Sequence, residues 1–307
     1  MTRAVYYDEF GGPEVLQIGE VEPLPMGPDT VRIEVAGAGI NPVDFKVMRG
    51  YLAGAFEHHF PIVPGWDVAG EVLAVGPSVS ELKPGDPVYG YARLDMIGHG
   101  TAADEVTLPI RVVAKAPTTV DLVTAAAVPL TGLTAFQLIR RLDIQLGETV
   151  LVHNASGGVG QFAVQFARLA GARVIGTASP ANHDHLQTLG VEPVAYGEGM
   201  AEAVRRLAPR GVDVVVDLIG GVLDTSDALL SDDGRVGSIT DAEGALRRGG
   251  VYVFVRPSRS DLTEIAQLID TGDVVVDVAG TYPFDKADVA YSRLEAGHVR
   301  GKLVLVP

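Results

Sequence analysis

A glycine-rich segment in the middle of the chain constrains the fold more than any other feature of the sequence. It extends from Ala155 to Gly160, directly after the apolar run Thr149–Val152 and before a segment in which Phe162 and Phe166 recur at helical spacing. A helix that starts immediately after a strand offers unpaired backbone N–H groups and a partial positive charge. Glycine lets an anion approach those groups without a Cβ in the way. The segment therefore predicts a strand, a tight turn and a helix that together hold a phosphate group.

The turn is close to the G-x-G-x-x-G pattern of dinucleotide-binding proteins, with Ala155 in place of the first glycine. A bare match to this pattern is weak evidence, but here the strand, the turn and the helix are in register. The alternative is a tight strand-to-helix turn that binds nothing, and the register favours the ligand site over it. We predict that a dinucleotide pyrophosphate is bound by six consecutive residues: Ala155, Ser156, Gly157, Gly158, Val159 and Gly160.

The pattern of the chain changes near residue 121. Before it, short strand candidates such as 30–35 and 68–75 are separated by Gly and Pro, which is typical of a β-rich domain. After it, apolar strand-like segments alternate with helix-like ones, which indicates a buried parallel sheet between helices. The sequence predicts an α/β fold class, with a β-rich domain over 1–121 and a doubly wound parallel-sheet domain over 122–257. We expect a helix over 121–142, parallel strands at 149–152, 173–176, 193–195, 213–217, 234–239 and 251–255, and further strands at 274–276 and 303–306.

Composition limits the partners of the chain. The net charge of -15 argues against nucleic acid and against an anionic membrane surface as partners. The chain contains no Cys, so disulfides and thiolate-ligated zinc are excluded. Neither a secretory signal nor an apolar run long enough to cross a membrane is recognisable, which predicts a cytoplasmic protein. A small molecule is the expected partner.

The segment after the second parallel strand bears on the type of dinucleotide. NAD sites place an acidic residue about 20 residues after the glycine turn, where it bonds the ribose hydroxyl. Here the strand ends Gly176-Thr177-Ala178-Ser179, without an acid. NADPH is therefore favoured as the cofactor, with Ser179 and His183 as candidate donors to its 2′-phosphate, although no Lys or Arg is evident nearby. The alternative for His183 is a solvated surface histidine.

Several motifs, taken in order, resemble those of one family. They are Asn41-Pro42-Val43-Asp44, Pro64-Gly65-Trp66-Asp67-Val68-Ala69-Gly70, the turn 155–160, Asp217-Leu218-Ile219-Gly220-Gly221 and Gly297-His298-Val299-Arg300-Gly301-Lys302. The chain resembles the zinc-free quinone oxidoreductase branch of the medium-chain dehydrogenase/reductase superfamily, essentially from end to end. The resemblance implies a GroES-like domain over 1–121 completed by 258–307, and a Rossmann domain over 122–257. It also implies a substrate cleft between the two domains and a homodimer that pairs through 251–255.

The zinc alcohol dehydrogenases of the same superfamily provide a contrast. They carry a catalytic Cys where this chain has Asn41, and a His where it has Trp66. Neither side chain replaces those ligands for zinc, so no metal is expected.

The resemblance also implies roles for individual residues. Asn41, Asp44 and Tyr51 are the candidate catalytic residues of the substrate site: Asn41 as a donor to the acceptor oxygen, Tyr51 as a proton donor. The alternatives are that Asn41 simply starts the turn before Pro42 and that Tyr51 is an ordinary packed tyrosine. The remaining candidate cofactor contacts are Tyr196, Gly220, Phe254, Val255, Arg256 and Lys302.

These expectations combine into a functional hypothesis. The leading interpretation is an NADPH-dependent, zinc-independent reductase that delivers hydride to a quinone or an α,β-unsaturated carbonyl compound. Two alternatives stay open: a trans-acting reductase of enoyl thioesters, and a non-catalytic NADPH- or quinone-binding sensor. The altered segment Gly100-Thr101-Ala102-Ala103-Asp104-Glu105, which in the family often carries an aromatic residue, leaves the substrate pocket undefined.

Overall fold

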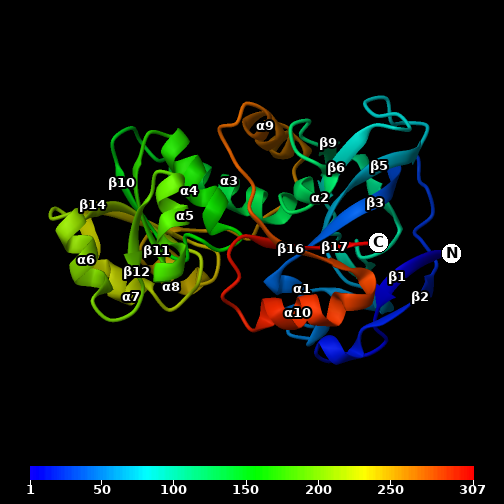
Figure 1. The fold of residues 1–307 in the computed structure, drawn as a ribbon, viewed down its shortest axis with the longest axis horizontal. Coiled ribbons are helices and arrows are strands. Elements are labelled where there is room, and N and C mark those ends of the chain that lie inside the picture. Colours follow the sequence, from blue (N-terminus) through cyan, green and yellow to red (C-terminus); the bar gives the residue numbers. More distant parts are fainter. The chain divides into compact units, whose positions relative to one another are not determined.

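The computed structural model describes all 307 residues, and the chain divides into two compact units. Unit 1 comprises Met1–Leu130 and Pro257–Pro307, and unit 2 comprises Thr131–Arg256. Figure 1 shows the elements of both units. Unit 1 is β-rich, and unit 2 is a parallel sheet covered by helices, so the predicted α/β fold class, GroES-like plus Rossmann, is confirmed.

Unit 1 is built around a seven-stranded sheet with the order β16-β17-β3-β5-β6-β9, in which β8 also pairs with β3. Two smaller sheets pair β1 with β2 and β4 with β7. The strands are β1 (Thr2–Tyr6), β2 (Gln17–Val21), β3 (Thr30–Ile40), β4 (Glu57–Val63), β5 (Asp67–Val75), β6 (Pro87–Tyr91), β7 (Met96–His99), β8 (Glu105–Pro109), β9 (Val113–Lys115), β16 (Val278–Pro283) and β17 (Lys302–Val306). The helices are η1 (Pro13–Val15), α1 (Pro42–Met48), η2 (Ile110–Val112), α2 (Leu122–Ala125), α9 (Arg259–Asp270), η5 (Phe284–Lys286) and α10 (Ala287–Glu295).

Strand β3 shows why these segments fold as they do. Val31, Ile33 and Val35 are buried and alternate with more exposed residues, as the two-residue period of a half-buried strand requires. Beyond Val35 the strand is increasingly buried, and it pairs antiparallel with β17, which the chain adds some 260 residues later. The C-terminal strand therefore belongs to the same sheet as β3 and β5.

Unit 2 contains a six-stranded sheet with the order β12-β11-β10-β13-β14-β15, and every pair in it is parallel. The strands are β10 (Thr149–Val152), β11 (Arg173–Ala178), β12 (Glu192–Ala195), β13 (Val212–Asp217), β14 (Leu230–Ser238) and β15 (Val251–Tyr252). The helices are α4 (Gly160–Leu169), η3 (Pro180–Asn182), α5 (His183–Thr188), α6 (Met200–Leu207), α7 (Leu223–Ser226), η4 (Asp227–Leu229) and α8 (Ala242–Arg247), and most of α3 (Pro129–Leu142).

The central strands of unit 2 are apolar along their whole length because both faces of the sheet are covered. Leu151, Ile175, Val215 and Val236 belong to one buried cluster against this sheet, together with Leu223 of α7. Burying a side chain of this size stabilises the fold by about 1.5–3 kcal/mol. Helix α4 is buried almost all round, polar Gln161 and Gln165 included, so the single apolar face inferred from its sequence understates its burial.

Three sequence-based element assignments were wrong in detail. The expected helix 121–142 is interrupted before Pro129, because proline disfavours helical backbone in the preceding residue and lacks the N–H that would continue the ladder. The expected strand 274–276 is irregular, and the strand lies instead at β16, while Val274 is buried. The expected strand 251–255 is ordered as β15 over two residues only.

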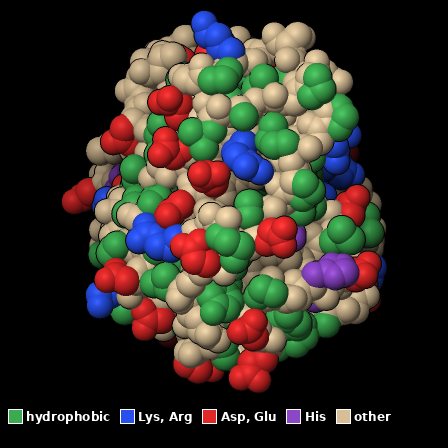
Figure 2. Space-filling model, turned by 90° about the vertical axis from the view of Figure 1, so that its right-hand side faces the viewer, with side chains coloured by type: hydrophobic (Ala, Val, Ile, Leu, Met, Phe, Trp, Pro, Cys, Tyr) green, Lys and Arg blue, Asp and Glu red, His purple; other side chains and the backbone are tan.

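No helix in the structure combines the length and the apolar character that a membrane crossing requires. The acidic side chains on the face shown in Figure 2 are spread among hydrophobic and basic ones rather than gathered in one patch. On this face, the net charge of the chain is therefore not concentrated at one place.

The contact between α4 and the turn before it yields a stability prediction. A Cβ on Gly160 would lie 2.1 Å from the carbonyl oxygen of Asn154 and 2.6 Å from the carbonyl carbon of Ala155. Both atoms belong to backbone, so Gly160→Ala should lower the free energy of unfolding by about 1–3 kcal/mol, as overpacking does. Chemical denaturation measures this, and Gly54→Ala, whose Cβ meets nothing within 4 Å, is the control. Equal stability of the two variants would contradict the close approach.

Candidate functional site

The turn between β10 and α4 brings the six predicted phosphate-binding residues together at the carboxyl edge of the parallel sheet. Asn154 has a φ of 58°, a left-handed conformation that Asn tolerates better than most residues. A Cβ on Gly157 would meet the side chain of Asn154 at 2.8 Å. Ala155 fits where the motif has its first glycine because Gly176 faces it from β11, where a second Cβ would lie 2.7 Å away. Steric constraints therefore favour small residues at Ala155, Gly157 and Gly176.

The backbone of this turn has the polarity that an anion site requires. The amides of Ala155 and Gly157 donate to Thr177 and Asn154, whereas those of Gly158, Val159 and Gly160 donate to no backbone acceptor outside α4. Such groups at the start of a ten-residue helix carry a partial positive charge. The turn thus fits a pyrophosphate group, through its backbone.

The candidate site for the adenosine of the cofactor lies where the neighbouring strands β11 and β12 end. Ala178 of β11 pairs with Ala195 of β12, so Ser179 and Tyr196 leave the sheet at the same edge. Tyr196 is exposed, and no acidic residue follows β11 before Asp184. The Asn182 amide donates to Ser156 Oγ over 3.0 Å and joins this segment to the phosphate turn.

His183, the first residue of α5, lies next to this edge. Its Nε2 is shielded from solvent and has no hydrogen-bond partner. The role of His183 as a donor to a 2′-phosphate therefore stays a prediction.

Asp217 shapes the next loop along the sheet. Its carboxylate accepts from the amides of Ile219 and Gly220 over 3.0 and 2.7 Å, and from the hydroxyls of Ser238 and Thr240 over 2.7 and 3.0 Å. Gly220 and the glycine after it both adopt positive φ values of 89° and 69°, which side chains disfavour. The carboxylate is saturated with donors and orders the loop, so Gly220 contributes through its backbone.

The segment after β15 places three more predicted cofactor contacts. Gln137 of α3 accepts from the amide of Arg256 over 3.1 Å and donates to its carbonyl over 2.9 Å, which fixes the backbone there. The side chain of Phe254 is 52% exposed, and Val255 is buried. Phe254 therefore presents an aromatic surface beside a fixed backbone.

Sequence analysis missed one polar residue of this edge. His153 directly follows β10, and its Nε2 lies 2.9 Å from Ser226 Oγ of α7. Burial lowers its pKa to about 4, and the Asp217 carboxylate opposes this only in part. The imidazole is therefore neutral. A histidine directly after an apolar strand, before the glycine turn, was the signal that could have identified it.

In unit 1, a buried cluster joins Asn41, Asp44, Asp67 and Lys302. The Lys302 ammonium donates to Asn41 Oδ1 over 2.5 Å, to the Ile40 carbonyl over 2.9 Å and to Asp67 Oδ2 over 3.1 Å. The Asn41 amide donates to the same Asp67 oxygen over 2.9 Å. The Asn41 backbone N–H donates to Asp44 Oδ2 over 2.7 Å in a capping box at the start of α1. Lys302 is 3% exposed and Asp67 fully buried.

The Asp67 carboxylate in this cluster also begins a helix. Its Oδ1 accepts from the backbone N–H of Leu130 in the first turn of α3, over 2.6 Å. A carboxylate at a helix N-terminus stabilises the partial positive charge there. Asp67 therefore links β5, β17, Asn41 and α3.

The charges of this cluster do not balance unless one carboxyl holds a proton. Burial raises the pKa of both Asp44 and Asp67, and the Lys302 ammonium lowers both. Asp67 has the ammonium in direct contact and three donors in all, so it keeps the charge. Asp44 has one donor and the Asp67 carboxylate nearby, and its pKa rises to about 8. Asp44 is therefore protonated at neutral pH.

The predicted residues of unit 1 therefore divide into two groups. Asn41, Asp44 and Lys302 meet in the buried cluster, although Lys302 was expected beside the cofactor. Tyr51 lies outside the cluster, in the turn after α1, and is 71% exposed. The partner of Lys302, Asp67, is 235 residues away in sequence, which no local pattern indicates.

The residues that stand where zinc relatives carry ligands do not fit zinc. The Asn41 amide is engaged by Asp67 and Lys302, and Trp66 packs edge-on against Tyr91 with ring centroids 6.2 Å apart. No group of three His, Cys, Asp or Glu side chains is placed to hold a metal ion. The donor set of this site therefore offers no metal chemistry.

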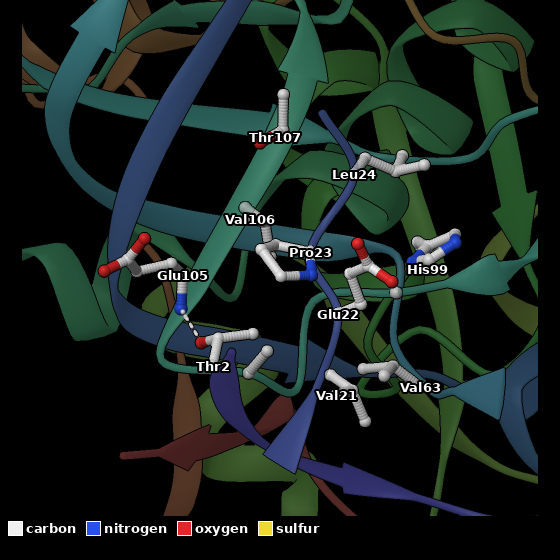
Figure 3. A pocket seen from close by; sticks show the side chains of 12 residues that line it. Thr2, Val21, Glu22, Pro23, Leu24, Val63, His99, Glu105, Val106 and Thr107 are labelled. Atoms are coloured by element: carbon white, nitrogen blue, oxygen red, sulfur yellow. Dashed lines mark hydrogen bonds between the residues drawn. The ribbon is translucent and has the colours of Figure 1, made fainter. Parts of the chain in front are cut away.

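Unit 1 also has a surface hollow between the start of β1, the segment after β2, and β8 (Figure 3). It is lined by twelve residues, including Thr2, Glu22, His99 and Glu105. Thr2 Oγ1 accepts from the backbone N–H of Glu105 over 3.1 Å. None of the predicted site residues lines it, so this hollow is separate from the candidate site.

Comparison with known proteins agrees with this organisation. Residues 27–118 match the family described as alcohol dehydrogenase GroES-like domain, and residues 189–305 match the family described as zinc-binding dehydrogenase. An NADPH-dependent alkenal/one oxidoreductase of Arabidopsis thaliana is 32% identical over 99% of this chain and 79% of the relative. The spectinabilin polyketide synthase system protein NorB of Streptomyces orinoci is 37% identical over 92% of this chain but only 13% of that much longer protein. The structure of Escherichia coli quinone oxidoreductase complexed with NADPH superposes with a TM-score of 0.84 at 28% identity, over 99% of this chain and 100% of the other.

The fold and the glycine turn define a two-domain oxidoreductase scaffold. The chain belongs to the medium-chain dehydrogenase/reductase superfamily, in its zinc-free quinone oxidoreductase branch.

The protonated state of Asp44 predicts opposite effects for two substitutions. Asp44→Asn keeps an acceptor for the backbone N–H of Asn41 and is neutral, like the protonated carboxyl, so it should preserve the fold at pH 7. Lys302→Met leaves the Asp67 carboxylate buried without its ammonium, and it should destabilise the protein by about 3–5 kcal/mol. Chemical denaturation at pH 7 measures both.

The stabilities of the wild type and of Asp44→Asn should also depend differently on pH. Because the pKa of Asp44 is raised in the folded state from 3.8 to about 8, the stability of the wild type should fall between about pH 4 and pH 8 relative to Asp44→Asn. Parallel stability profiles for the two proteins would show that Asp44 is ionised in the fold.

A second pH dependence follows from His153. Its folded pKa is lowered from 6.5 to about 4, so its contribution to stability is complete above about pH 6.5 and is lost as the pH falls toward 4. The loss should reach about 3 kcal/mol at pH 4. Unfolding of the wild type and of His153→Gln across this range measures it, and identical profiles would contradict burial of a neutral imidazole.

Proposed function

We propose that this chain is a zinc-independent reductase that uses NADPH to reduce a quinone or an α,β-unsaturated carbonyl compound. The observation that carries the proposal is the glycine turn of unit 2, in which the amides of Gly158, Val159 and Gly160 donate to no backbone acceptor outside α4 and no acid lies at the end of β11. Support also comes from relatives whose names specify an NADPH-dependent alkenal/one oxidoreductase and a quinone oxidoreductase with NADPH.

The residues of unit 2 that would hold NADPH are those of its carboxyl edge. The amides of Gly158, Val159 and Gly160 stabilise the negative charge of the pyrophosphate. Ala155–Gly157 form the tight turn that lets the pyrophosphate approach these amides. Ser179, His183 and Tyr196 hold the adenosine end, where the absence of a carboxylate removes repulsion of a 2′-phosphate. Gly220 and the segment Phe254–Arg256 hold the nicotinamide end.

NADPH, when bound, supplies a hydride to the electrophilic carbon of the substrate. The task of the chain is to orient that carbon, to exclude water and to stabilise the developing oxygen anion. Reduction of an enone leaves an enolate that needs a proton, whereas the dihydroquinone anion is more stable by itself. A dedicated acid is therefore less important for a quinone.

The three predicted catalytic residues have different parts in this proposal. Tyr51 is exposed, and its phenol is the proton donor that a substrate can reach. Asn41 and Asp44 are buried and bonded to their neighbours, so they order the start of α1 in unit 1. Lys302 acts with them, through Asn41.

A second candidate function is reduction of an enoyl thioester. The similarity to part of a polyketide synthase system protein favours it, because such systems process thioester-bound chains. Acidic side chains spread over the face in Figure 2 disfavour a basic rim for an anionic carrier there. A non-catalytic sensor has no observation of this kind in its support.

The proposal extends to location and assembly. We propose a cytoplasmic homodimer in which β15, the last strand of its sheet, pairs with a second copy. Backbone groups at a free sheet edge are a template for such pairing. Light scattering of the purified chain measures the mass directly.

Turnover tests the proposed function. NADPH should be consumed with a 2-alkenal or a simple quinone, faster than NADH is, and a metal chelator should leave the rate unchanged. A panel that adds an enoyl thioester, and an alcohol with the oxidised cofactor, separates the alternatives. Alcohol oxidation that requires added zinc would overturn the proposal, and NADPH binding without any turnover would favour a sensor.

A further inference from the structure

A chain of hydrogen bonds joins the phosphate turn of unit 2 to α7. His153 Nε2 lies 2.9 Å from Ser226 Oγ, and that hydroxyl donates to the Val222 carbonyl over 2.7 Å. On the other side, Thr177 Oγ1 lies 3.5 Å from His153 Nδ1 and accepts from the Asn154 backbone N–H over 3.1 Å. All three side chains, His153, Thr177 and Ser226, are at most 2% exposed. This set is called the histidine relay below.

The donors of the histidine relay can be assigned from its ends. The Ser226 hydroxyl uses its proton on Val222, so it accepts from His153, and the proton of the imidazole is on Nε2. Nδ1 is then an acceptor, toward which the Thr177 hydroxyl points while it accepts from Asn154. Only a neutral imidazole satisfies both ends.

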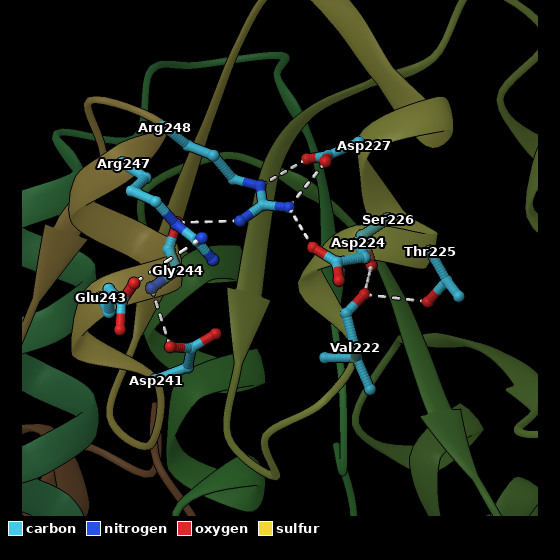
Figure 4. Close-up of polar contacts among 10 residues, drawn as sticks. All are labelled: Val222, Asp224, Thr225, Ser226, Asp227, Asp241, Glu243, Gly244, Arg247 and Arg248. Atoms are coloured by element: carbon cyan, nitrogen blue, oxygen red, sulfur yellow. Dashed lines mark hydrogen bonds and ion pairs between the residues drawn. The ribbon is translucent and has the colours of Figure 1, made fainter.

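Helix α7 is fixed from its other side by Arg248, as Figure 4 shows. The Arg248 guanidinium donates to Asp224 over 2.6 Å, to both oxygens of Asp227 over 2.6 and 2.7 Å, and to the Gly244 carbonyl of α8 over 2.9 Å. Bidentate pairs of this kind hold geometry as well as charge. Ser226 is therefore a fixed point to which His153 binds.

The histidine relay connects the two halves of the candidate dinucleotide site. Val222 directly follows the Gly220–Gly221 pair, whose start is held by the Asp217 carboxylate. Asn154 directly precedes the phosphate turn. The relay thus spans from the residue before the turn to the residue after the glycine loop.

We propose that His153 is a positioning residue that sets the separation between the phosphate turn and the Gly220–Gly221 loop, and so aligns the nicotinamide half of the cofactor with its pyrophosphate. This inference rests on the proposed function, because it assumes a dinucleotide on that edge. His153 acts through Ser226 and Asn154 and touches no reacting atom.

The proposal predicts a difference between whole and truncated ligands. NADPH engages both loops, whereas 2′,5′-ADP lacks the nicotinamide half and engages only the adenosine end and the turn. Ser226→Ala removes the acceptor of His153, and His153→Phe removes both ends of the relay. Each should weaken NADPH binding about tenfold, the effect of one buried hydrogen bond, and change 2′,5′-ADP binding less than twofold.

Calorimetry on the full-length chain measures the two dissociation constants, with unfolding midpoints measured alongside. His153→Gln, which keeps a neutral donor and acceptor, should recover most of the NADPH affinity. Thr188→Ala, which loses a hydroxyl contact with the His185 carbonyl on α5, is the control and should bind like the wild type. If His153→Phe does not fold, the two dissociation constants of Ser226→Ala test the proposal.

Failure of the proposed function and failure of the positioning role of His153 give different results. If the wild type binds neither NADPH nor 2′,5′-ADP, the proposed function fails. If the wild type binds both, and Ser226→Ala binds both as well as the wild type does, only the positioning role of His153 is overturned. Equal weakening of both ligands would also overturn it, because the relay would then support the turn alone.

Discussion

The close approach of the first turn of α4 to the backbone before it is the contact on which the rest of unit 2 depends. Gly160 leaves no room for a Cβ against Asn154 and Ala155, and Gly176 makes the same allowance for Ala155. The amides of Gly158, Val159 and Gly160 at the start of this helix donate to no backbone acceptor outside α4. The proposed anion site is thus made of backbone rather than basic side chains, in a chain whose net charge is -15.

Unit 1 is organised by a different interaction, the buried ammonium of Lys302 between Asp67 and Asn41. Removing such a charge from water is costly, and the cost is offset only because each donor and acceptor is paired. One ammonium serves two carboxyls, so Asp44 keeps its proton. A lysine from the last strand of the chain supplies the positive charge of this region.

The sequence predicted what depends on local pattern. The alternation of strands and helices, the glycine turn and the missing acid after β11 are all readable over a few residues, and the fold class followed from them. The sequence did not indicate contacts between residues that are far apart in the chain and meet only in the folded structure. Lys302 was expected beside the cofactor, and its bond to Asp67, 235 residues away, is what no local pattern indicated. His153 was given no role, because its partners Thr177 and Ser226 lie beside it only in the folded structure.

Hydrogen–deuterium exchange of the full-length protein with and without NADPH tests the central claim most directly. The account predicts that NADPH slows exchange most strongly at the amides of residues 158–160, with a smaller effect at Gly220 and Gly221. Slowed exchange elsewhere in the chain, with residues 158–160 unchanged at saturating NADPH, would contradict it.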